Sequence, residues 1–230
     1  NVNLTNVIST GNGNNGAYVS TADGSITVNG GDFSGNVDGL DIRTDAGNVT
    51  LNNVISKGNE SEGGYVWTPD AILINGGDFS NNGGWGLYLS SAFGTIKMNS
   101  VTAVGNLNGA RLGAPDIEVI CGNYSNNDEH GLVLGGGNTY LGGPHLTGNG
   151  LGEYDLVSGT ISFGPCEKSL ANNSGSENGL KTQNNLVPQI PVTGSVCDVE
   201  KKISLEPGDG FVFFQNLCGL DFQLEEVKAN

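Results

Sequence analysis

The sequence predicts an all-β fold of stacked coils, a solenoid of about seven to eight turns followed by a small C-terminal β module. Two observations predict it. Short runs of alternating apolar residues recur at the same two places along the chain, and an asparagine recurs between them every 21 to 24 residues. A fixed period of this length is the signature of repeats that stack on one another. The asparagines, each preceded by Gly or Asn, are Asn12, Asn36, Asn59, Asn82, Asn106, Asn127 and Asn149.

The two apolar runs in each interval predict strands, because apolar side chains that alternate with a period of two line one face of a strand. The first run precedes the asparagine by about ten residues, as in Ile26 and Val28, and Ile161 with Phe163 opens an eighth copy. The second run follows the asparagine as Gly-apolar-any-apolar, as in residues 39–42 and 86–89. We therefore expect at least two strands in each coil.

Between the first run and the asparagine, large and small side chains exchange places from coil to coil. The position five before the asparagine begins Val7, Gly31, Val54, Gly77, and the position three before it begins Ser9, Phe33, Ser56, Phe79. If both positions point inward, each aromatic ring fills space that smaller neighbours leave. Strands stack about 4.8 Å apart, so equivalent asparagines would align and satisfy turn amides that would otherwise be buried unpaired. We assign this Asn ladder an architectural role.

This repeat (apolar-any-apolar, then Gly/Asn-Asn, then Gly-apolar-any-apolar) resembles the right-handed parallel β-helix repeats of the pectate-lyase-like superfamily and of bacterial surface proteins. The resemblance covers about residues 1–164 and implies a right-handed parallel β-helix. It implies no single activity, because that superfamily includes lyases, hydrolases, phage spikes, adhesins and inert stalks.

The period ends after Phe163, so we expect a solenoid over 1–164, a linker or cap over 165–191 and a small disulfide-bonded β module over 192–230. Fewer than 40 residues make a poor independent core, and covering the last coil is the simplest task for this module. The first coil has no visible cover. A missing domain could cover it, or the C-terminal module of the next copy, which would give a head-to-tail filament.

Composition limits the partners and the compartment. Nine basic and 24 acidic residues give a net charge of −15, which disfavours binding to nucleic acid and to anionic membranes. No stretch approaches the roughly 20 apolar residues of a membrane span, so no membrane insertion is expected. The chain begins at Asn1 without a methionine or a signal-like segment, as a mature or excised product would.

Four cysteines, an even number, favour an oxidising and therefore extracellular or cell-surface location. Of the three possible pairings we favour Cys197–Cys218 with Cys121–Cys166. The second pair lies two coils apart in the expected stack, farther than the roughly 4.4–6.8 Å that a disulfide allows between Cα atoms. The separation of 45 residues therefore counts against this second pair.

The outward positions of the second strand run carry aromatic and charged residues that form the candidate ligand site. Lyases of the resembled superfamily bind polysaccharide along one strand face, hold calcium with acidic residues and remove a proton with Arg or Lys. For this chain the resemblance therefore implies a polysaccharide-binding row, with calcium as the one cofactor left open. The row consists of Tyr18, Asp41, Arg43, Tyr65, Trp67, Tyr88 and Arg111.

The same row has a purely structural interpretation, because Tyr and Trp form strands readily and pack against each other along a sheet. Asp41 and Arg111 would lie three coils apart, roughly 14 Å, too far for one concerted step. No metal site and no catalytic residue is therefore assigned. We expect a non-catalytic extracellular structural protein that assembles head to tail with itself or acts as a stalk or adhesin. The alternative is a polysaccharide-binding or polysaccharide-cleaving enzyme of the lyase type.

Overall fold

The computed structural model describes residues 1–166. The expected β module over 192–230, the Cys197–Cys218 pair and all but the first two residues of the expected linker lie outside the described residues. Within residues 1–166 every regular element is a strand, and every strand pair is parallel. The predicted all-β solenoid is confirmed, with about seven turns.

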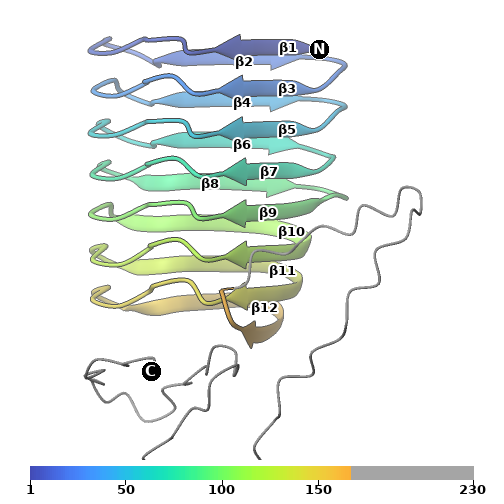
Figure 1. Ribbon diagram of the computed structural model, residues 1–230, viewed down its shortest axis with the longest axis vertical. Helices are drawn as coiled ribbons and strands as arrows, with labels where there is room; N and C mark the ends of the chain where they lie inside the picture. The colour runs from blue at the N-terminus through green and yellow to red at the C-terminus, as the bar shows by residue number, and fades with distance from the viewer. Residues whose placement is uncertain (167–230) are drawn as a thin grey trace, which may run out of the picture. The chain divides into compact units, whose positions relative to one another are not determined.

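The strands form a three-sided coil (Figure 1). One side consists of β1 (Val2–Thr5), β3 (Ile26–Asn29), β5 (Val49–Asn52), β7 (Ile72–Asn75) and β9 (Thr95–Asn99). The second side consists of β2 (Ala17–Thr21), β4 (Leu40–Thr44), β6 (Gly64–Thr68) and β8 (Trp85–Ser91). The third side is a row of single-residue bridges that runs from Ile8 to His145.

The last strands, β10 (Asn108–Ile120), β11 (His130–Gly142) and β12 (Gly152–Gly164), belong to both of the first two sides. In the earlier coils a turn separates the two sides, as at residues 92–94 between β8 and β9. The asparagine interval shortens from 24 residues to 21 where β10 begins, and with fewer residues per coil the chain crosses this corner in an extended conformation.

The winding is right-handed, as the resemblance implied. In Figure 1 the strands β1, β3, β5, β7 and β9 lie in front and run to the left, while the paler β2, β4, β6 and β8 lie behind and run to the right. Successive coils descend from the N-terminus. For an observer who looks down the stack from the first coil, the chain therefore turns clockwise as it moves away. This is the sense of a right-handed helix.

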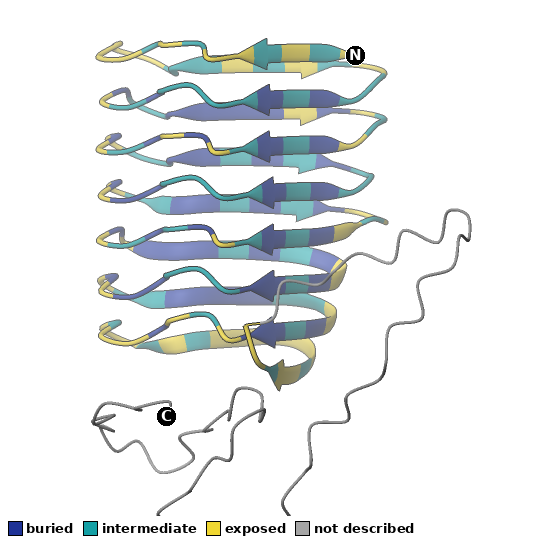
Figure 2. Ribbon diagram, in the orientation of Figure 1, coloured by how far each residue is buried: buried dark blue, intermediate teal, exposed yellow. Residues whose placement is uncertain are grey.

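The core fills the space between the three sides (Figure 2). Phe33, Phe79 and Tyr124 have no exposed surface, and the predicted inward orientation of the alternating positions is confirmed. The structure also shows which residue each ring packs against. A Cβ atom placed on Gly77 would lie 3.0 Å from the ring of Phe79, so the ring packs over the glycine two residues earlier in its own coil. The two alternations are thus coupled: a coil with an aromatic ring three positions before the ladder asparagine has Gly five positions before it, and a coil with a small residue there has Val.

Backbone conformation explains why each ladder asparagine follows Gly or Asn. The preceding residue has a positive φ in every coil, in a region that only Gly and, less readily, Asn adopt without a large steric cost. These residues are Gly11 (69°), Gly35 (68°), Gly58 (63°), Asn81 (58°), Gly105 (67°), Asn126 (55°) and Gly148 (76°). The conformation turns the chain from the third side toward the ladder.

One core residue carries a polar atom without a partner. The hydroxyl of Tyr124 is buried and makes no hydrogen bond within the part of the chain that the structure describes, and burial raises the pKa of this tyrosine. We expect Tyr124→Phe to raise the free energy of unfolding by about 1 kcal/mol, because it removes the desolvation cost of an unpaired hydroxyl and keeps the ring. Urea unfolding of the two proteins measures the difference. A less stable Tyr124→Phe variant would show that the hydroxyl has a partner in solution.

Candidate functional site

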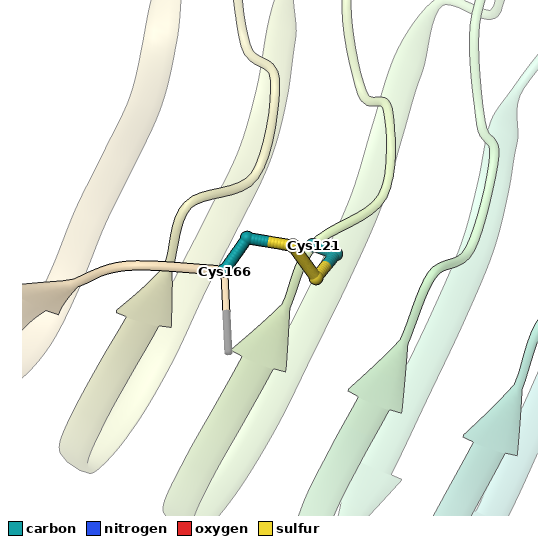
Figure 3. Close-up of a disulfide and its surroundings, with 2 residues drawn as sticks. All are labelled: Cys121 and Cys166. Atoms are coloured by element: carbon teal, nitrogen blue, oxygen red, sulfur yellow. A yellow bond between two sulfur atoms is a disulfide. The ribbon is translucent and has the colours of Figure 1, made fainter. Parts of the chain in front are cut away.

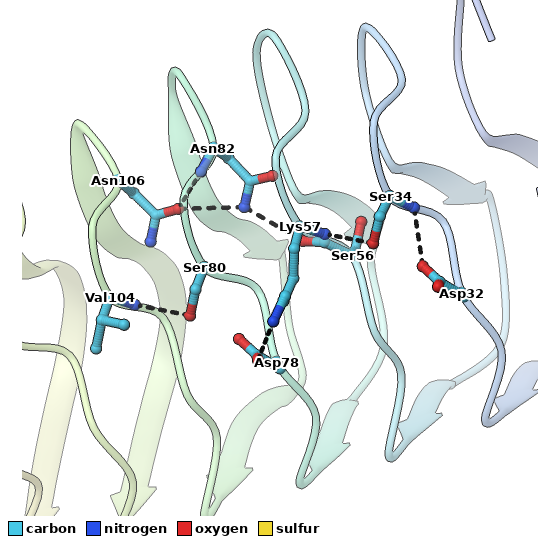
Figure 4. Close-up of polar contacts among 9 residues, drawn as sticks. All are labelled: Asp32, Ser34, Ser56, Lys57, Asp78, Ser80, Asn82, Val104 and Asn106. Carbon is cyan, nitrogen blue, oxygen red and sulfur yellow. Dashed lines mark hydrogen bonds and ion pairs between the residues drawn. The ribbon is translucent and has the colours of Figure 1, made fainter. Parts of the chain in front are cut away.

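The Asn ladder connects neighbouring coils through side-chain oxygens. Oδ1 of Asn82 accepts hydrogen bonds from the backbone N of Asn59 at 3.0 Å and from its Nδ2 at 2.9 Å. The same pattern joins Asn82 to Asn106, at 2.8 Å and 3.1 Å (Figure 4). The five inner asparagines of the ladder are at most 3% exposed. The oxygen of Asn59 accepts one donor, the backbone N of Asn36. The side-chain oxygens of Asn36, Asn82, Asn106, Asn127 and Asn149 each satisfy two donors from the preceding coil, which would otherwise be unpaired.

A second asparagine ladder lies on the outer surface at the ends of β3, β5, β7 and β9. The Nδ2 atom of each side chain donates to the Oδ1 atom in the preceding coil, at 2.8 Å from Asn52 to Asn29 and at 2.9 Å in the next two steps, from Asn75 and from Asn99. Sequence reasoning missed this ladder. Its signal was present, because the four asparagines repeat at intervals of 23, 23 and 24 residues at the last position of the first strand run.

The candidate ligand row becomes a continuous stack on the second side of the coil. The rings of Tyr65 and Tyr88 stack with centroids 5.2 Å apart and an interplanar angle of 21°. The guanidinium of Arg43 lies 4.8 Å from the centre of the Tyr65 ring, and that of Arg111 lies 5.5 Å from the Tyr88 ring. We call these four side chains the Arg–Tyr stack. Both faces of each tyrosine ring are covered by a neighbour, so neither ring offers a free face to a sugar.

Asp41 and Arg43 neutralise each other beside the stack. Two hydrogen bonds join the carboxylate and the guanidinium, at 2.8 Å and 3.0 Å, and Asp41 is only 9% exposed. This hydrogen bonding raises the pKa of Arg43. A general base must be unprotonated at the working pH, so Arg43 is unsuited to remove a proton, and Asp41 already has a cation.

The remaining residues of the row are only partly connected to the stack. Tyr18 pairs with Asp41 from the preceding coil and is 61% exposed. Trp67 pairs with Arg43 of the coil before it and with Ser90 of the coil after it. Arg111 makes no ion pair within residues 1–166. The register places Asp41 and Arg111 three coils apart, with Tyr65 and Tyr88 between them. The row is thus a packed structural stack with one exposed aromatic ring and one arginine that lacks a carboxylate partner.

A serine and a histidine that are 20 residues apart in sequence meet on the third side. Nδ1 of His145 lies 3.3 Å from Oγ of Ser125 and 3.2 Å from Oδ1 of Asn123. Sequence reasoning missed this contact, because it joins neighbouring coils. Ser125 is 1% exposed and donates its own proton to Asn123, so its oxygen is unavailable as a nucleophile. The three side chains therefore form a hydrogen-bonded cluster between neighbouring coils.

Two carboxyl groups meet near the start of the second side. The backbone N of Glu62 donates to Oδ1 of Asp38 at 3.2 Å, and the hydroxyl of Ser61 donates to the Glu62 carboxyl group. Burial raises the pKa of Glu62, and the hydrogen bond and negative charge of Asp38 raise it further against the lowering effect of Ser61. Glu62 therefore holds its proton to a higher pH in the folded protein than in the unfolded chain.

This raised pKa predicts a pH-dependent effect of Glu62→Gln. Protonation of Glu62 contributes fully to the free energy of unfolding below the pKa of Glu62 in the unfolded chain. This contribution is lost as the pH rises through the pKa of Glu62 in the folded protein. Glutamine stays neutral, so the variant should melt at a higher temperature than the wild type near pH 7 and at the same temperature near pH 3. Glu60→Gln, at an exposed carboxyl in the same turn, is the control. An equal shift at both pH values would contradict this origin.

A disulfide joins Cys121 to Cys166 across an intermediate coil (Figure 3). The Cα atoms are 5.0 Å apart although the residues are 45 positions apart. The expectation that two coils separate these cysteines is wrong, because the chain after β12 returns across the middle coil. A Cβ on Gly143 would lie 2.7 Å from the backbone N of Cys166, so the glycine lets the chain pass over the middle coil and reach Cys121.

Other site types find little support within residues 1–166. No three His, Cys, Asp or Glu side chains converge there as a metal site, and no helix of this region could span a bilayer. A shallow hollow of about 360 Å³ lies on the first side, between Asp116, Glu118, Asn138 and Tyr140. It includes no residue of the Arg–Tyr stack.

Comparison of the chain with protein-family models, with curated proteins and with solved structures gives no match. The parallel solenoid is therefore established by the structure itself.

Proposed function

We propose that this protein is a non-catalytic extracellular structural protein, a rod that joins copies of itself head to tail into a filament or serves as a stalk or adhesin. The polarity of the Asn ladder is the observation that carries the proposal. Every coil presents acceptors to the coil before it and donors to the coil after it. Within residues 1–166, one end of the ladder therefore offers the side-chain oxygen of Asn12, and the other offers the backbone amide of Asn149. Two such ends are complementary.

Three further features support a structural role. The charged and aromatic side chains of the candidate row are engaged with one another along the stack. The strand β1 is hydrogen-bonded on one side only within residues 1–166, and an open strand edge is a template for another chain. The Cys121–Cys166 disulfide suits an oxidising compartment.

Electron microscopy and sedimentation over a range of protein concentrations test the assembly. Within β1, Val2 and Leu4 direct their amides to β3, so the amide of Asn3 points to the open edge. Asn3→Pro should therefore prevent pairing at this edge and leave the backbone hydrogen bonds to β3 intact, although it removes the side-chain acceptor of Asn29. Asn3→Ala is the control, because it removes the same side chain and keeps the amide. The filament would be ruled out if the wild type remained monomeric at every concentration.

A second candidate function is polysaccharide binding or polysaccharide cleavage of the lyase type. The observation that favours it is the lack of a carboxylate partner for Arg111 within the described chain, together with the exposed ring of Tyr18. Incubation with acidic polysaccharides and calcium, followed by detection of unsaturated products, distinguishes the two functions. Activity that Arg111→Ala abolishes would favour the enzyme.

A further inference from the structure

Residues 1–166 contain seven Asn-Gly pairs, at Asn12, Asn15, Asn29, Asn75, Asn82, Asn108 and Asn149. Such pairs are chemically labile in flexible chains. The backbone nitrogen of the glycine attacks Cγ of the asparagine, a five-membered succinimide forms, and the side-chain nitrogen leaves as ammonia. Water then opens the ring to aspartate or isoaspartate. Glycine favours the attack because it has no side chain and a mobile backbone.

The stacked coils prevent this reaction at most of these pairs by holding the attacking nitrogen. The glycine amide donates to a carbonyl oxygen of a neighbouring coil in five of them: from Gly16 to Asp38 at 2.8 Å, from Gly30 to Asn52 at 2.7 Å, from Gly76 to Asn99 at 2.8 Å, from Gly83 to Asn59 at 3.0 Å and from Gly150 to Asn127 at 3.0 Å. The sixth pair, at Asn108, forms the first two residues of β10. A nitrogen fixed in a hydrogen bond must first be released before it can reach the side chain.

Asn12 is the exception. The amide of Gly13 makes no hydrogen bond within residues 1–166, and a Cβ on Gly13 would meet no atom within 4 Å. Asn12 is exposed, whereas the equivalent asparagines of the inner coils are buried. In the later coils the amide that follows the asparagine donates to a carbonyl of the preceding coil. In four of them this is the ladder carbonyl, as from Glu60 to Asn36 at 2.9 Å, and Val37 and Leu107 donate to other carbonyls of that coil. The first coil has no such carbonyl within the described chain.

We propose that Asn12 is a site of spontaneous deamidation and that the solenoid protects the other six Asn-Gly pairs. The product has a structural consequence. Nδ2 of Asn12 donates to Oδ1 of Asn36 at 3.0 Å and to Oγ of Ser9 at 3.1 Å, and a carboxylate at position 12 has no such donor. A negative charge then faces the oxygen of Asn36. The modification removes the side-chain donor at the N-terminal end of the ladder and loosens the first coil.

Peptide mapping by mass spectrometry after incubation of the 230-residue protein in mildly alkaline buffer tests the proposal. Asn12 should deamidate at least about tenfold faster than Asn29, Asn75 and Asn82 in the folded protein. In urea the four sites should react at similar rates, which shows that the fold causes the difference. Gly13→Ala should slow the reaction at Asn12 without unfolding the coil, because the space around Gly13 is open.

Two results would overturn the proposal. Equal rates at Asn12 and at the inner pairs in the folded protein would show that the glycine hydrogen bonds give no protection. An Asn12 side chain that stays intact in the folded protein but reacts in urea would show that the first coil is as well protected as the others.

Discussion

Replacing Asn82 with alanine is expected to lower the free energy of unfolding by about 3–5 kcal/mol. The variant loses the oxygen that accepts both the backbone N and the Nδ2 of Asn59, and this site is buried. The backbone N–H of Asn59 and one of its two side-chain N–H groups are then left without partners, while the other still donates to Oγ of Ser56 at 3.2 Å. Each buried unpaired N–H costs about 1–3 kcal/mol. Urea unfolding followed by circular dichroism measures the loss.

Asn12→Ala is the matched control for this experiment. Asn12 belongs to the same ladder, but no group within the described residues donates to its oxygen, and it is exposed. We expect a loss below about 1 kcal/mol. Equal losses for Asn12→Ala and Asn82→Ala would contradict a ladder in which each oxygen serves the preceding coil.

Phe79→Ala is expected to destabilise the protein by about 3–5 kcal/mol, the range for removal of a buried aromatic ring. The ring has no exposed surface and packs over Gly77, and the equivalent positions in the adjacent coils hold the small residues Ser56 and Ala103. None of these neighbours can fill the cavity. The loss should appear as a lower midpoint of urea unfolding with an unchanged slope.

Phe93→Ala provides the same chemical change at a surface site. Phe93 lies in the turn between β8 and β9 and is 83% exposed. Its loss should change the free energy of unfolding by no more than about 0.5 kcal/mol. A small effect at Phe79, similar to that at Phe93, would contradict the packing of rings over glycines.

The sequence was most informative where one physical rule repeats in every coil. The asparagine period predicted the stacked coils, and the alternating runs predicted the strands, because each coil must align its apolar side chains and its buried turn amides with those of the next. The exchange of Phe33 and Phe79 with smaller residues predicted the core. Its coupling to Gly31 and Gly77 needed coordinates, because it depends on the direction of each ring.

Contacts specific to one place in the stack were harder to predict. The Cys121–Cys166 disulfide depends on the path of the chain over Gly143 after the repeat has ended. The meeting of His145 with Ser125 depends on the register of single-residue bridges on the third side. In the candidate row the sequence identified the outward residues but could not show that Arg43 and Arg111 cover the outer faces of two stacked tyrosines.

Hydrogen exchange of the ladder amides, measured by NMR, tests most directly that side-chain oxygens of asparagine bind the coils together. The backbone amides of Asn36, Asn59 and Asn82 donate to the next asparagine side chain at 2.8–3.0 Å. They should exchange only through large-scale unfolding, as slowly as the amides of the central strands. The amide of Gly13, which makes no hydrogen bond within residues 1–166, should exchange rapidly. Ladder amides that exchange as fast as Gly13 would contradict the account.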